Sequence, residues 1–579
     1  MISYAYMKIL KEYLKPYTGK IIVIALLYAL SILAMIITPK IMSNIITFGI
    51  AVQDMHYIWT RGLLMIAIAT PTLLIILVIS KLKADLTTGY IADLRKGIFK
   101  KINSLTAEEF ASKGTASLLT RSTDDTWFMQ EVVGQIIYVL VSTPLLFIGG
   151  IVMTFIADWI LALIMLGISP IILFFIWLIN RRLFGLYDNS EKYMDIQNKV
   201  MRERLKGLRV IRAFNKEPYE HERVSDATKT MAVYIIKANV LTSIVQPISA
   251  FLLNIATVLI LYFGAMRIQT SVLLTAGDVI ATIQYIALIM SSLMMGSALL
   301  LYMPKIKVTL NRLGEIFAME GSEADAEESI KLAGDIKIEN MDFCYPDSQT
   351  PVLKNINVDV QNGQVVGIIG GTGSGKTTLM KLLMGFYRPN EGNMYIGGKS
   401  VFDLNAGTIR DNASIALQKA MIFRGTIEDN IKMGNQNATE EQIKEAAEIS
   451  QLKELISGNA DGLKHELTQA GGNISGGQKQ RINIARTIIK DASIFIFDDS
   501  FSALDYLTES KLRKKVNKYL SGKTQLIVTQ RAATAMRCDK IYVMDKGEIV
   551  GSGAHEDLLK TCPIYKEIYD SQLGGVING

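Results

Sequence analysis

A glycine-rich segment that ends in lysine and threonine has the residue types and spacing needed to bind phosphate groups. It matches the pattern G-x-x-x-x-G-K-[ST] and consists of Gly370, Gly371, Thr372, Gly373, Ser374, Gly375, Lys376 and Thr377. The apolar run 365–369 before it predicts a buried strand, and residues 377–384 after it, Thr378 included, predict a helix. Such a turn points backbone N–H groups at phosphate oxygens, with Lys376 reaching the β- and γ-phosphates and Thr377 a Mg²⁺ ion. The segment therefore predicts a site for ATP and Mg²⁺.

Asp499 and Gln530, which lie later in the chain, occupy positions where residues that act in ATP hydrolysis are expected. The apolar run 494–497 leads to Asp498, whose carboxylate can bind Mg²⁺, and then to Asp499, where a glutamate would normally align the attacking water. Asp499 is one methylene group shorter, so its carboxylate would lie more than ~1 Å too far back. Gln530, which stands where a histidine is expected, cannot become cationic. We expect this site to bind ATP well and to hydrolyse it poorly.

A second motif with phosphate-binding character precedes Asp498. It opens a predicted helix, whose N-terminus favours negative charge, and it consists of Ser475, Gly476, Gly477 and Gln478. A further short motif, Ser502-Ala503-Leu504-Asp505, follows Asp499. If the Ser475 helix lies across the domain from Lys376, it must serve a nucleotide that another chain holds. The order of the motifs therefore predicts a head-to-tail dimer.

The elements that carry these motifs belong to the polar half of a chain whose other half is apolar. Half of the 579 residues are apolar and the mean hydropathy is +0.28, which excludes a purely soluble protein. Six runs without charged residues are long enough to cross a hydrocarbon core of roughly 30 Å as helices. These runs are 21–38, 63–79, 132–157, 159–180, 238–266 and 279–303. After residue 305 the composition becomes that of a soluble α/β domain.

The basic residues predict how the chain is oriented. Lysine and arginine are concentrated before the first span and in the long loops 80–131 and 181–237, whereas the other loops are short or nearly uncharged. We expect a multi-pass protein of the cell membrane, that is, the cytoplasmic or inner membrane. By the positive-inside rule, both of its termini then face the cytoplasm. This distribution largely explains the net charge of +7, so nothing here indicates a nucleic-acid partner. The three cysteines show no metal or redox spacing.

The composition along the chain predicts four successive segments. Residues 1–16 form an amphipathic helix that lies on the membrane surface, and residues 17–304 form the six-helix membrane domain. The two long cytoplasmic loops extend the membrane helices below the bilayer, with tips near 113–125 and 207–214. Residues 305–334 form a basic connector and an acidic linker, and residues 335–579 form the nucleotide-binding domain.

This ordered set of motifs resembles the ATP-binding cassette (ABC) family, in particular half-transporters of the bacterial multidrug-exporter type, and the resemblance covers essentially the whole chain. It implies a multidomain membrane protein with the type I ABC exporter fold, in which an all-α six-helix transmembrane domain is followed by an α/β P-loop NTPase nucleotide-binding domain. It also implies that Tyr345 stacks on adenine and that Gln418 contacts Mg²⁺ together with Thr377 and Asp498. Residues 502–505, which include Asp505, correspond to the D-loop, and residues 203–214 resemble the second coupling region.

The departures from the family pattern imply a division of labour between two subunits. Asp499 and Gln530 are typical of the subunit that owns the degenerate site of a heterodimeric exporter. The signature residues Ser475, Gly477 and Gln478 would then act on ATP held by a partner half-transporter with the expected glutamate and histidine. We expect export of drug-like, lipid or peptide substrates, with hydrolysis mainly at the site shared with the partner. The alternative is an ATP-sensing regulatory membrane subunit without transport of its own.

Overall fold

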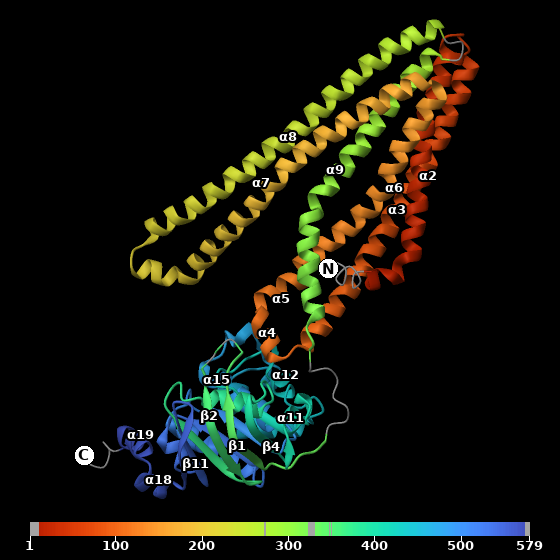
Figure 1. Ribbon diagram of the computed structural model, residues 1–579. Helices are drawn as coiled ribbons and strands as arrows, with labels where there is room; N and C mark the ends of the chain where they lie inside the picture. The colour runs from red at the N-terminus through yellow and green to blue at the C-terminus, as the bar shows by residue number, and fades with distance from the viewer. Residues whose placement is uncertain (1–10, 271–273, 322–329, 347, 349, 574–579) are drawn as a thin grey trace. The chain divides into compact units, whose positions relative to one another are not determined.

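The computed structural model describes all residues except 1–10, 271–273, 322–329, 347, 349 and 574–579, and it divides into two units (Figure 1). Unit 1 comprises residues 1–101 and 116–318, and unit 2 comprises residues 102–115 and 319–579. Residues 1–10 of the surface helix expected at 1–16, and residues 322–329 of the connector and linker expected at 305–334, lie outside the described residues.

Unit 1 is built from helices, six of which are long and apolar enough to cross a membrane within the described part of the chain. Each predicted run lies inside one of them, because an uninterrupted apolar stretch must satisfy its backbone hydrogen bonds within the helix when lipid surrounds it. The predicted six-helix membrane domain is therefore confirmed. The six helices are α2 (Thr18–Asn44), α3 (Met55–Asn103), α6 (Asp124–Ala157), α7 (Trp159–Ala213), α8 (Glu217–Thr270) and α9 (Ala276–Ala318).

The helices α7, α8 and α9 are drawn as long ribbons in Figure 1. Their bounds extend well beyond the apolar runs. Lysine, arginine and glutamate are good helix formers, so the change from apolar to charged residues does not end a helix. Helix α7 runs through Ala213, and a turn at 214–216, with Asn215 at φ 52°, joins it to α8. The turn thus lies at the end of the tip expected at 207–214, and α9 covers the first part of the connector expected from residue 305.

The first cytoplasmic tip contains the two short helices α4 (Ala107–Lys113) and α5 (Thr115–Ser122). Thr106 and Glu109 form a capping box that starts α4, and Gly114 ends it with φ 73°. The segment that groups with unit 2, residues 102–115, therefore lies mostly before the tip expected at 113–125.

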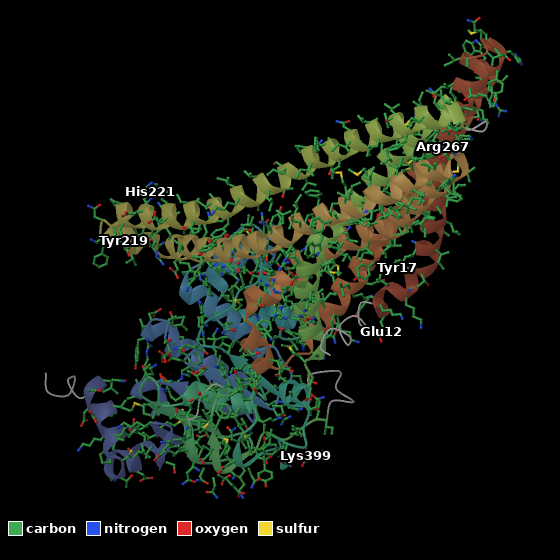
Figure 2. All side chains as sticks on the ribbon, turned by 45° about the horizontal axis from the view of Figure 1, so that its top comes forward. Glu12, Tyr17, Tyr219, His221, Arg267 and Lys399 are labelled. Atoms are coloured by element: carbon green, nitrogen blue, oxygen red, sulfur yellow. The ribbon has the colours of Figure 1, made fainter. Side chains whose placement is uncertain are left out.

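Two ion pairs join helices of unit 1 at the ends opposite the long loops. Asp158 accepts hydrogen bonds from the first backbone N–H groups of α7 and pairs with Arg267 of α8 at 2.9 Å. Lys40 of α2 pairs with Asp278 of α9 at 2.7 Å. Figure 2 shows Arg267 at one end of α8 and His221, near the turn, at the other.

Unit 2 combines sheets and helices around a six-stranded sheet of order β12-β11-β3-β10-β9-β6, in which only the β11–β12 pair is antiparallel. Alternate residues of its strands belong to two different apolar cores, Phe495 and Phe497 to one and Ile494 and Ile496 to the other. Both faces are thus covered, as a mainly parallel sheet requires. The strands are β3 (Val365–Gly370), β6 (Ala413–Ala416), β9 (Ile494–Asp498), β10 (Thr524–Thr529), β11 (Lys540–Asp545) and β12 (Glu548–Gly553).

The remaining elements of unit 2 flank this sheet along the chain. An antiparallel sheet of order β2-β1-β4-β5 is formed by β1 (Ile336–Phe343), β2 (Leu353–Val360), β4 (Glu391–Ile396) and β5 (Lys399–Ser400), and β7 (Gly425–Thr426) pairs with β8 (Glu466–Leu467). Besides α4, the helices are α10 (Lys376–Leu383), α11 (Ala406–Asn412), α12 (Ile427–Lys432), α13 (Glu440–Ile449), α14 (Lys453–Ser457), α15 (Gly476–Ile488), α16 (Tyr506–Tyr519), α17 (Ala532–Ala535), α18 (His555–Thr561) and α19 (Pro563–Leu573). The predicted α/β architecture of this domain is confirmed.

Candidate nucleotide site

Three adjacent parallel strands place the candidate site at one edge of the six-stranded sheet. In register, Ile369 at the end of β3 pairs with Thr529 of β10, and Val528 pairs with Asp498 at the end of β9. Ligands of open α/β sheets bind at the carboxyl ends of the strands. The topology therefore brings the glycine-rich loop, Asp498 and the segment after Thr529 to the same edge.

The glycine-rich loop folds around the side chain of Lys376. Gly373 and Gly375 have φ values of 82° and 97°, and a Cβ atom on Gly370 would lie 2.2 Å from the carbonyl oxygen of Met544. Glycine is thus required both by conformation and by close packing. The ammonium group of Lys376 donates to the carbonyl oxygens of Gly370 and Gly371, at 3.0 and 2.7 Å, and to the Ser374 hydroxyl at 3.1 Å. These contacts hold the cation against the loop.

Of the charged groups of the site, Lys376 and Asp498 are buried and Asp499 is half-buried. Burial lowers the pKa of the Lys376 ammonium group and raises the pKa of the carboxyl groups of Asp498 and Asp499. Nearby charge of the opposite sign would offset the cost of burying each group. Phosphate oxygens beside Lys376 and a divalent cation beside Asp498 would supply it, so these residues fit ATP with Mg²⁺.

The hydroxyl group of Thr377 donates to Oδ1 of Asp498 at 3.4 Å, so two of the three predicted Mg²⁺ ligands face one point, whereas Gln418 lies beside Asp499. Among the described residues, no group of three or more His, Cys, Asp or Glu side chains could hold a metal. A site with one carboxylate and one hydroxyl suits Mg²⁺, which takes its other ligands from phosphates and water. Bound there, the ion would neutralise charge on the phosphates, while Thr377 and Asp498 would orient it.

Asp499 and Gln530 also face this space. The amide nitrogen of Gln418 lies 3.5 Å from Oδ2 of Asp499, and the hydroxyl group of Thr372 lies 3.5 Å from Oε1 of Gln530. Asp499 has φ 46°, a left-handed conformation that aspartate tolerates better than most residues. The pocket has a volume of about 260 Å³. Its lining includes Thr372, Gly373, Gly375, Lys376, Thr377, Thr378, Gln418, Asp498, Asp499 and Gln530.

Tyr345 reaches the helix after the loop without lining this pocket. Its hydroxyl group lies 3.1 Å from the Thr378 hydroxyl, and its ring meets the rings of Phe343 and Tyr387 edge-on. Tyr345 lines a neighbouring hollow of about 550 Å³ together with Phe386 and other residues. The tyrosine thus lies beside the phosphate-binding loop, at a position from which its ring can meet a base.

The predicted signature residues do not line the pocket that contains Lys376. Ser475 caps α15 through a capping box with Gln478, in which each side chain bonds the backbone N–H of the other residue, at 3.3 and 2.8 Å. A Cβ atom on Gly477 would lie 3.4 Å from the carbonyl oxygen of Ala503, and Asp505 caps α16. The start of α15 therefore adjoins the D-loop segment of the same chain.

The sequence reasoning missed Arg531 and Glu509, which support the residue after Gln530. Arg531 forms an ion pair with the buried Glu509 at 2.6 Å and donates to the carbonyl oxygen of Ser502 at 2.8 Å. The Thr534 hydroxyl donates to the same carboxylate at 2.7 Å. A charged pair 22 residues apart has no periodic signal in a sequence, so only the fold reveals it.

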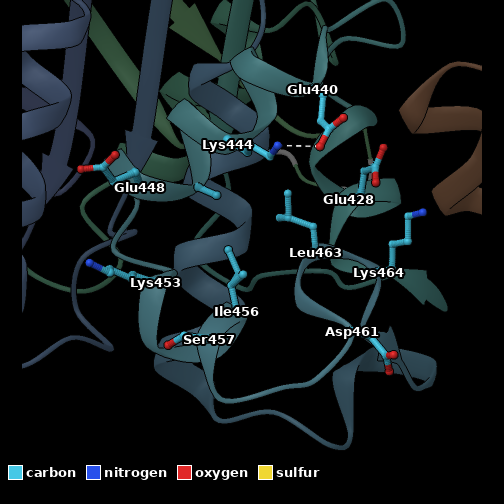
Figure 3. Close-up of a pocket in the computed structure, with 11 residues that line it drawn as sticks. Glu428, Glu440, Lys444, Glu448, Lys453, Ile456, Ser457, Asp461, Leu463 and Lys464 are labelled. Carbon is cyan, nitrogen blue, oxygen red and sulfur yellow. Dashed lines mark ion pairs between the residues drawn. The ribbon is translucent and has the colours of Figure 1, made fainter.

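A separate hollow of about 560 Å³ lies among α12, α13 and α14. Figure 3 shows the side chains that surround it, including the ion pair of Glu440 with Lys444 at 2.6 Å. It shares no lining residue with the pocket of Lys376. Its mixed exposed charges do not select a ligand.

Comparisons with known proteins identify the family. Residues 21–293 match the model described as the ABC transporter transmembrane region, and residues 353–502 match the model described as ABC transporter. The chain is 34% identical, over 565 residues, to the uncharacterized ABC transporter ATP-binding protein YfiB of Bacillus subtilis (strain 168), with 97% of this chain and 98% of that protein covered. The chain belongs to the ABC transporter family.

The transporter also resembles an ATP-dependent lipid A-core flippase of Syntrophus aciditrophicus (strain SB), with 28% identity and coverage of 83% of this chain and 80% of the flippase. Its fold matches the structure of a bacterial Atm1-family ABC exporter with ATP bound, at a TM-score of 0.83 and 21% identity, over 97% of this chain and 98% of that one. The chain is thus a half-transporter for ATP-driven transport with the type I ABC exporter fold, and it must pair with a second subunit or with a copy of itself.

Proposed function

We propose that this half-transporter is the degenerate-site subunit of a heterodimeric exporter. The observation that carries the proposal is the composition of the pocket around Lys376. It holds Lys376, Thr377, Gln418 and Asp498, which are expected to bind phosphate and Mg²⁺, but it offers Asp499 and Gln530 at the two positions that act in hydrolysis. Phosphoryl transfer depends on alignment and charge stabilisation, which both residues supply less well than glutamate and histidine. The nucleotide held here acts mainly to join the subunits.

The signature residues serve a second nucleotide, held by the partner. Ser475 and Gln478 lie at the N-terminus of α15, outside the pocket of their own chain. The helix dipole and the first N–H groups of α15 favour a phosphate there. The partner's loop, glutamate and histidine complete that site, so this chain contributes to hydrolysis without cleaving its own ATP rapidly.

Exposed apolar side chains support pairing with such a partner. At the turn between α7 and α8, Val210, Phe214 and Tyr219 are 60, 71 and 64% exposed (Figure 2 labels Tyr219). On unit 2, Leu417, Met421 and Phe423 are also exposed. Contiguous exposed apolar groups mark interaction sites. We assign the turn to the partner's nucleotide-binding domain and the second surface to the corresponding turn of the partner.

The transported molecules are proposed to be amphipathic. A cavity of about 230 Å³ between α7, α8 and α9 is lined by apolar side chains and by four polar ones, Asn180, Thr242, Gln246 and Ser297. The Asn180 amide nitrogen is buried without a hydrogen-bond partner among the described residues. A drug, lipid or short peptide with an apolar part and a hydrogen-bond acceptor would suit it. Both termini face the cytoplasm of the cell, and transport is outward.

The test compares the full-length chain alone with the same chain co-purified with a half-transporter that carries the glutamate and the histidine. ATPase activity is measured in lipid nanodiscs for both preparations. The chain alone should bind ATP·Mg²⁺ and turn over slowly, whereas the pair should be active. Turnover by a verified homodimer that equals the activity of the pair would refute the heterodimer.

A further inference from the structure

Helix α17, which follows Gln530, has an N-terminus that is capped by a distant residue. The residue before it, Arg531, makes no side-chain capping bond. Instead, the side-chain oxygen of Gln572 accepts a hydrogen bond from the backbone N–H of Ala532 at 2.8 Å. The first N–H groups of a helix lack partners within the helix, so Gln572 supplies one from 40 residues away.

The same side chain also binds the backbone of Gln530. The amide nitrogen of Gln572 donates to the carbonyl oxygen of Gln530 at 2.8 Å. The planar amide group of Gln572 thus bridges residues 530 and 532. Its oxygen accepts from the N–H of Ala532, and its nitrogen donates to the carbonyl oxygen of Gln530. Because β10 ends at Thr529, this bridge spans the turn between the sheet and α17.

The last described helix, α19, is firmly anchored at the other end of this connection. Tyr565 is fully buried, and its hydroxyl group lies 2.8 Å from Nδ1 of His555. Ile564, Ile568 and Leu573 pack against the apolar core that contains Ala532. Gln572 itself is exposed, so its side chain can be replaced without disturbing this packing.

The bridge matters because Gln530 carries the side chain that faces the phosphate-binding loop. Oε1 of Gln530 lies 3.5 Å from the Thr372 hydroxyl, and Gln530 lines the pocket with Lys376 and Asp499. Small displacements of groups around a reacting phosphate have large effects. Holding the backbone of residue 530 therefore sets the position of its side chain.

We infer that Gln572 is a positioning residue, which holds the segment 530–532 so that the Gln530 side chain meets the γ-phosphate of ATP. The inference rests on the proposed nucleotide site, and it makes the C-terminal helix α19 part of that site's support. Because only the γ-phosphate end of the nucleotide is involved, loss of the bridge weakens binding of a nucleoside triphosphate and spares binding of a diphosphate.

The test uses the full-length chain with its partner subunit in nanodiscs. The complex is photolabelled on ice with radioactive 8-azido-ATP. The subunits are separated on a gel so that only this chain's site is read. Non-hydrolysable AMP-PNP or ADP competes with the label, which is kept well below its own dissociation constant so that the concentration for half competition reports the affinity of the competitor alone. Gln572→Leu should raise the AMP-PNP concentration needed for half competition by about fivefold, the loss expected for one or two exposed hydrogen bonds, and leave that for ADP unchanged.

A second variant separates positioning from general damage. In Gln572→Glu, a charged carboxylate keeps the bond from Ala532 and repels the Gln530 carbonyl oxygen, whereas a protonated carboxyl group can donate to it. Relative to the wild type at each pH, AMP-PNP competition by this variant should recover as the pH falls from about 6.5 to about 4.5, close to the ordinary glutamate pKa of about 4.3. Gln572→Leu should not recover, and the control Ser571→Leu should match the wild type.

Equal weakening for AMP-PNP and ADP, or no weakening, would overturn the inference and leave the proposed function standing. Failure of the wild-type chain to take up the label at all would instead remove the proposed site, and the inference with it.

Discussion

The side-chain nitrogen of Gln418 lies 3.5 Å from Oδ2 of Asp499, so the residue expected to contact Mg²⁺ touches the residue at the hydrolytic position. Gln418 follows β6 by two residues and Asp499 follows β9 by one, and these strands are neighbours in the sheet. The contact therefore results from the fold. A change in the length or charge of residue 499 therefore also alters the hydrogen bond with Gln418.

Restoring the expected residues should increase hydrolysis at this chain's site. In the double variant Asp499→Glu with Gln530→His, the side chain at position 499 is longer by one methylene group. The histidine at position 530 places a group that can become cationic beside the γ-phosphate. We expect the ATPase activity of the full-length chain in nanodiscs to rise by about tenfold or more, because single groups that stabilise the transition state contribute on this scale. Gln530→Asn with Asp499 unchanged serves as the control. An unchanged rate in the double variant would mean that another feature limits this site.

Substitutions at the start of α15 should damage hydrolysis more than substitutions at residue 499. Gly477→Asp places a carboxylate where the partner's phosphate is expected, and it should lower the ATPase activity of the pair by about 100-fold. The matched control is Ser457→Asp, which adds the same charge at an exposed position of α14 outside these motifs. Asp499→Asn should reduce activity by less than about threefold, since residue 499 is already poorly placed. If Asp499→Asn lowered the activity more than Gly477→Asp in the same preparation, the assignment of the degenerate and the hydrolytic site would be wrong.

Asp499 should also lower the stability of the nucleotide-binding domain at neutral pH. Burial raises the pKa of its carboxyl group, so the folded chain binds this proton more tightly than the unfolded chain does. The contribution of the group to stability is therefore highest at acidic pH and falls as the pH rises from the ordinary to the raised pKa. By calorimetry without nucleotide, Asp499→Asn should raise the unfolding temperature by about 1–3 °C at neutral pH. The gain should shrink on acidification, and the exposed Asp461→Asn should show none.

Accessibility of single cysteines should report the orientation of unit 1. Asp54 lies in the short connection between α2 and α3, Thr270 ends α8, and Lys192 lies in the charged part of α7. All three are exposed. In intact cells, Asp54→Cys and Thr270→Cys should react with a membrane-impermeant maleimide, and Lys192→Cys should react only after the cells are opened. Reaction of position 192 in intact cells would reverse the proposed topology.

The sequence predicted the features that depend on local patterns. Uncharged runs mark the six spans. The motif at 370–377 predicts a preceding strand and a following helix, because its glycines and lysine bind phosphate in that arrangement. The ends of the helices were harder to place. Charged residues such as those after Lys305 favour a helix as much as a loop, so α9 continues to Ala318 without a signal where it leaves the membrane.

Contacts between distant segments escaped the sequence for a different reason. The pairs of Arg531 with Glu509 and of Gln572 with Ala532 join residues 22 and 40 positions apart. Their side chains are common surface types, and nothing local distinguishes them from solvated ones. They become recognisable only when the packing of α16 and α19 places them beside the turn after β10.

The hairpin of α7 and α8 has a mechanical consequence. The charged part of α7, residues 181–213, is about 50 Å long at ~1.5 Å per residue. Tyr193 stacks on Tyr234 with ring centres 4.9 Å apart, and Arg223 pairs with Glu203 at 2.6 Å, so the two helices are tied together along this length. A rod of this kind bends little, and a rotation of about 6° where it leaves the membrane would carry its end by about 5 Å, roughly one helical turn. The hairpin therefore acts as a mechanical amplifier, which converts small angular changes in one place into displacements of ångström scale far away.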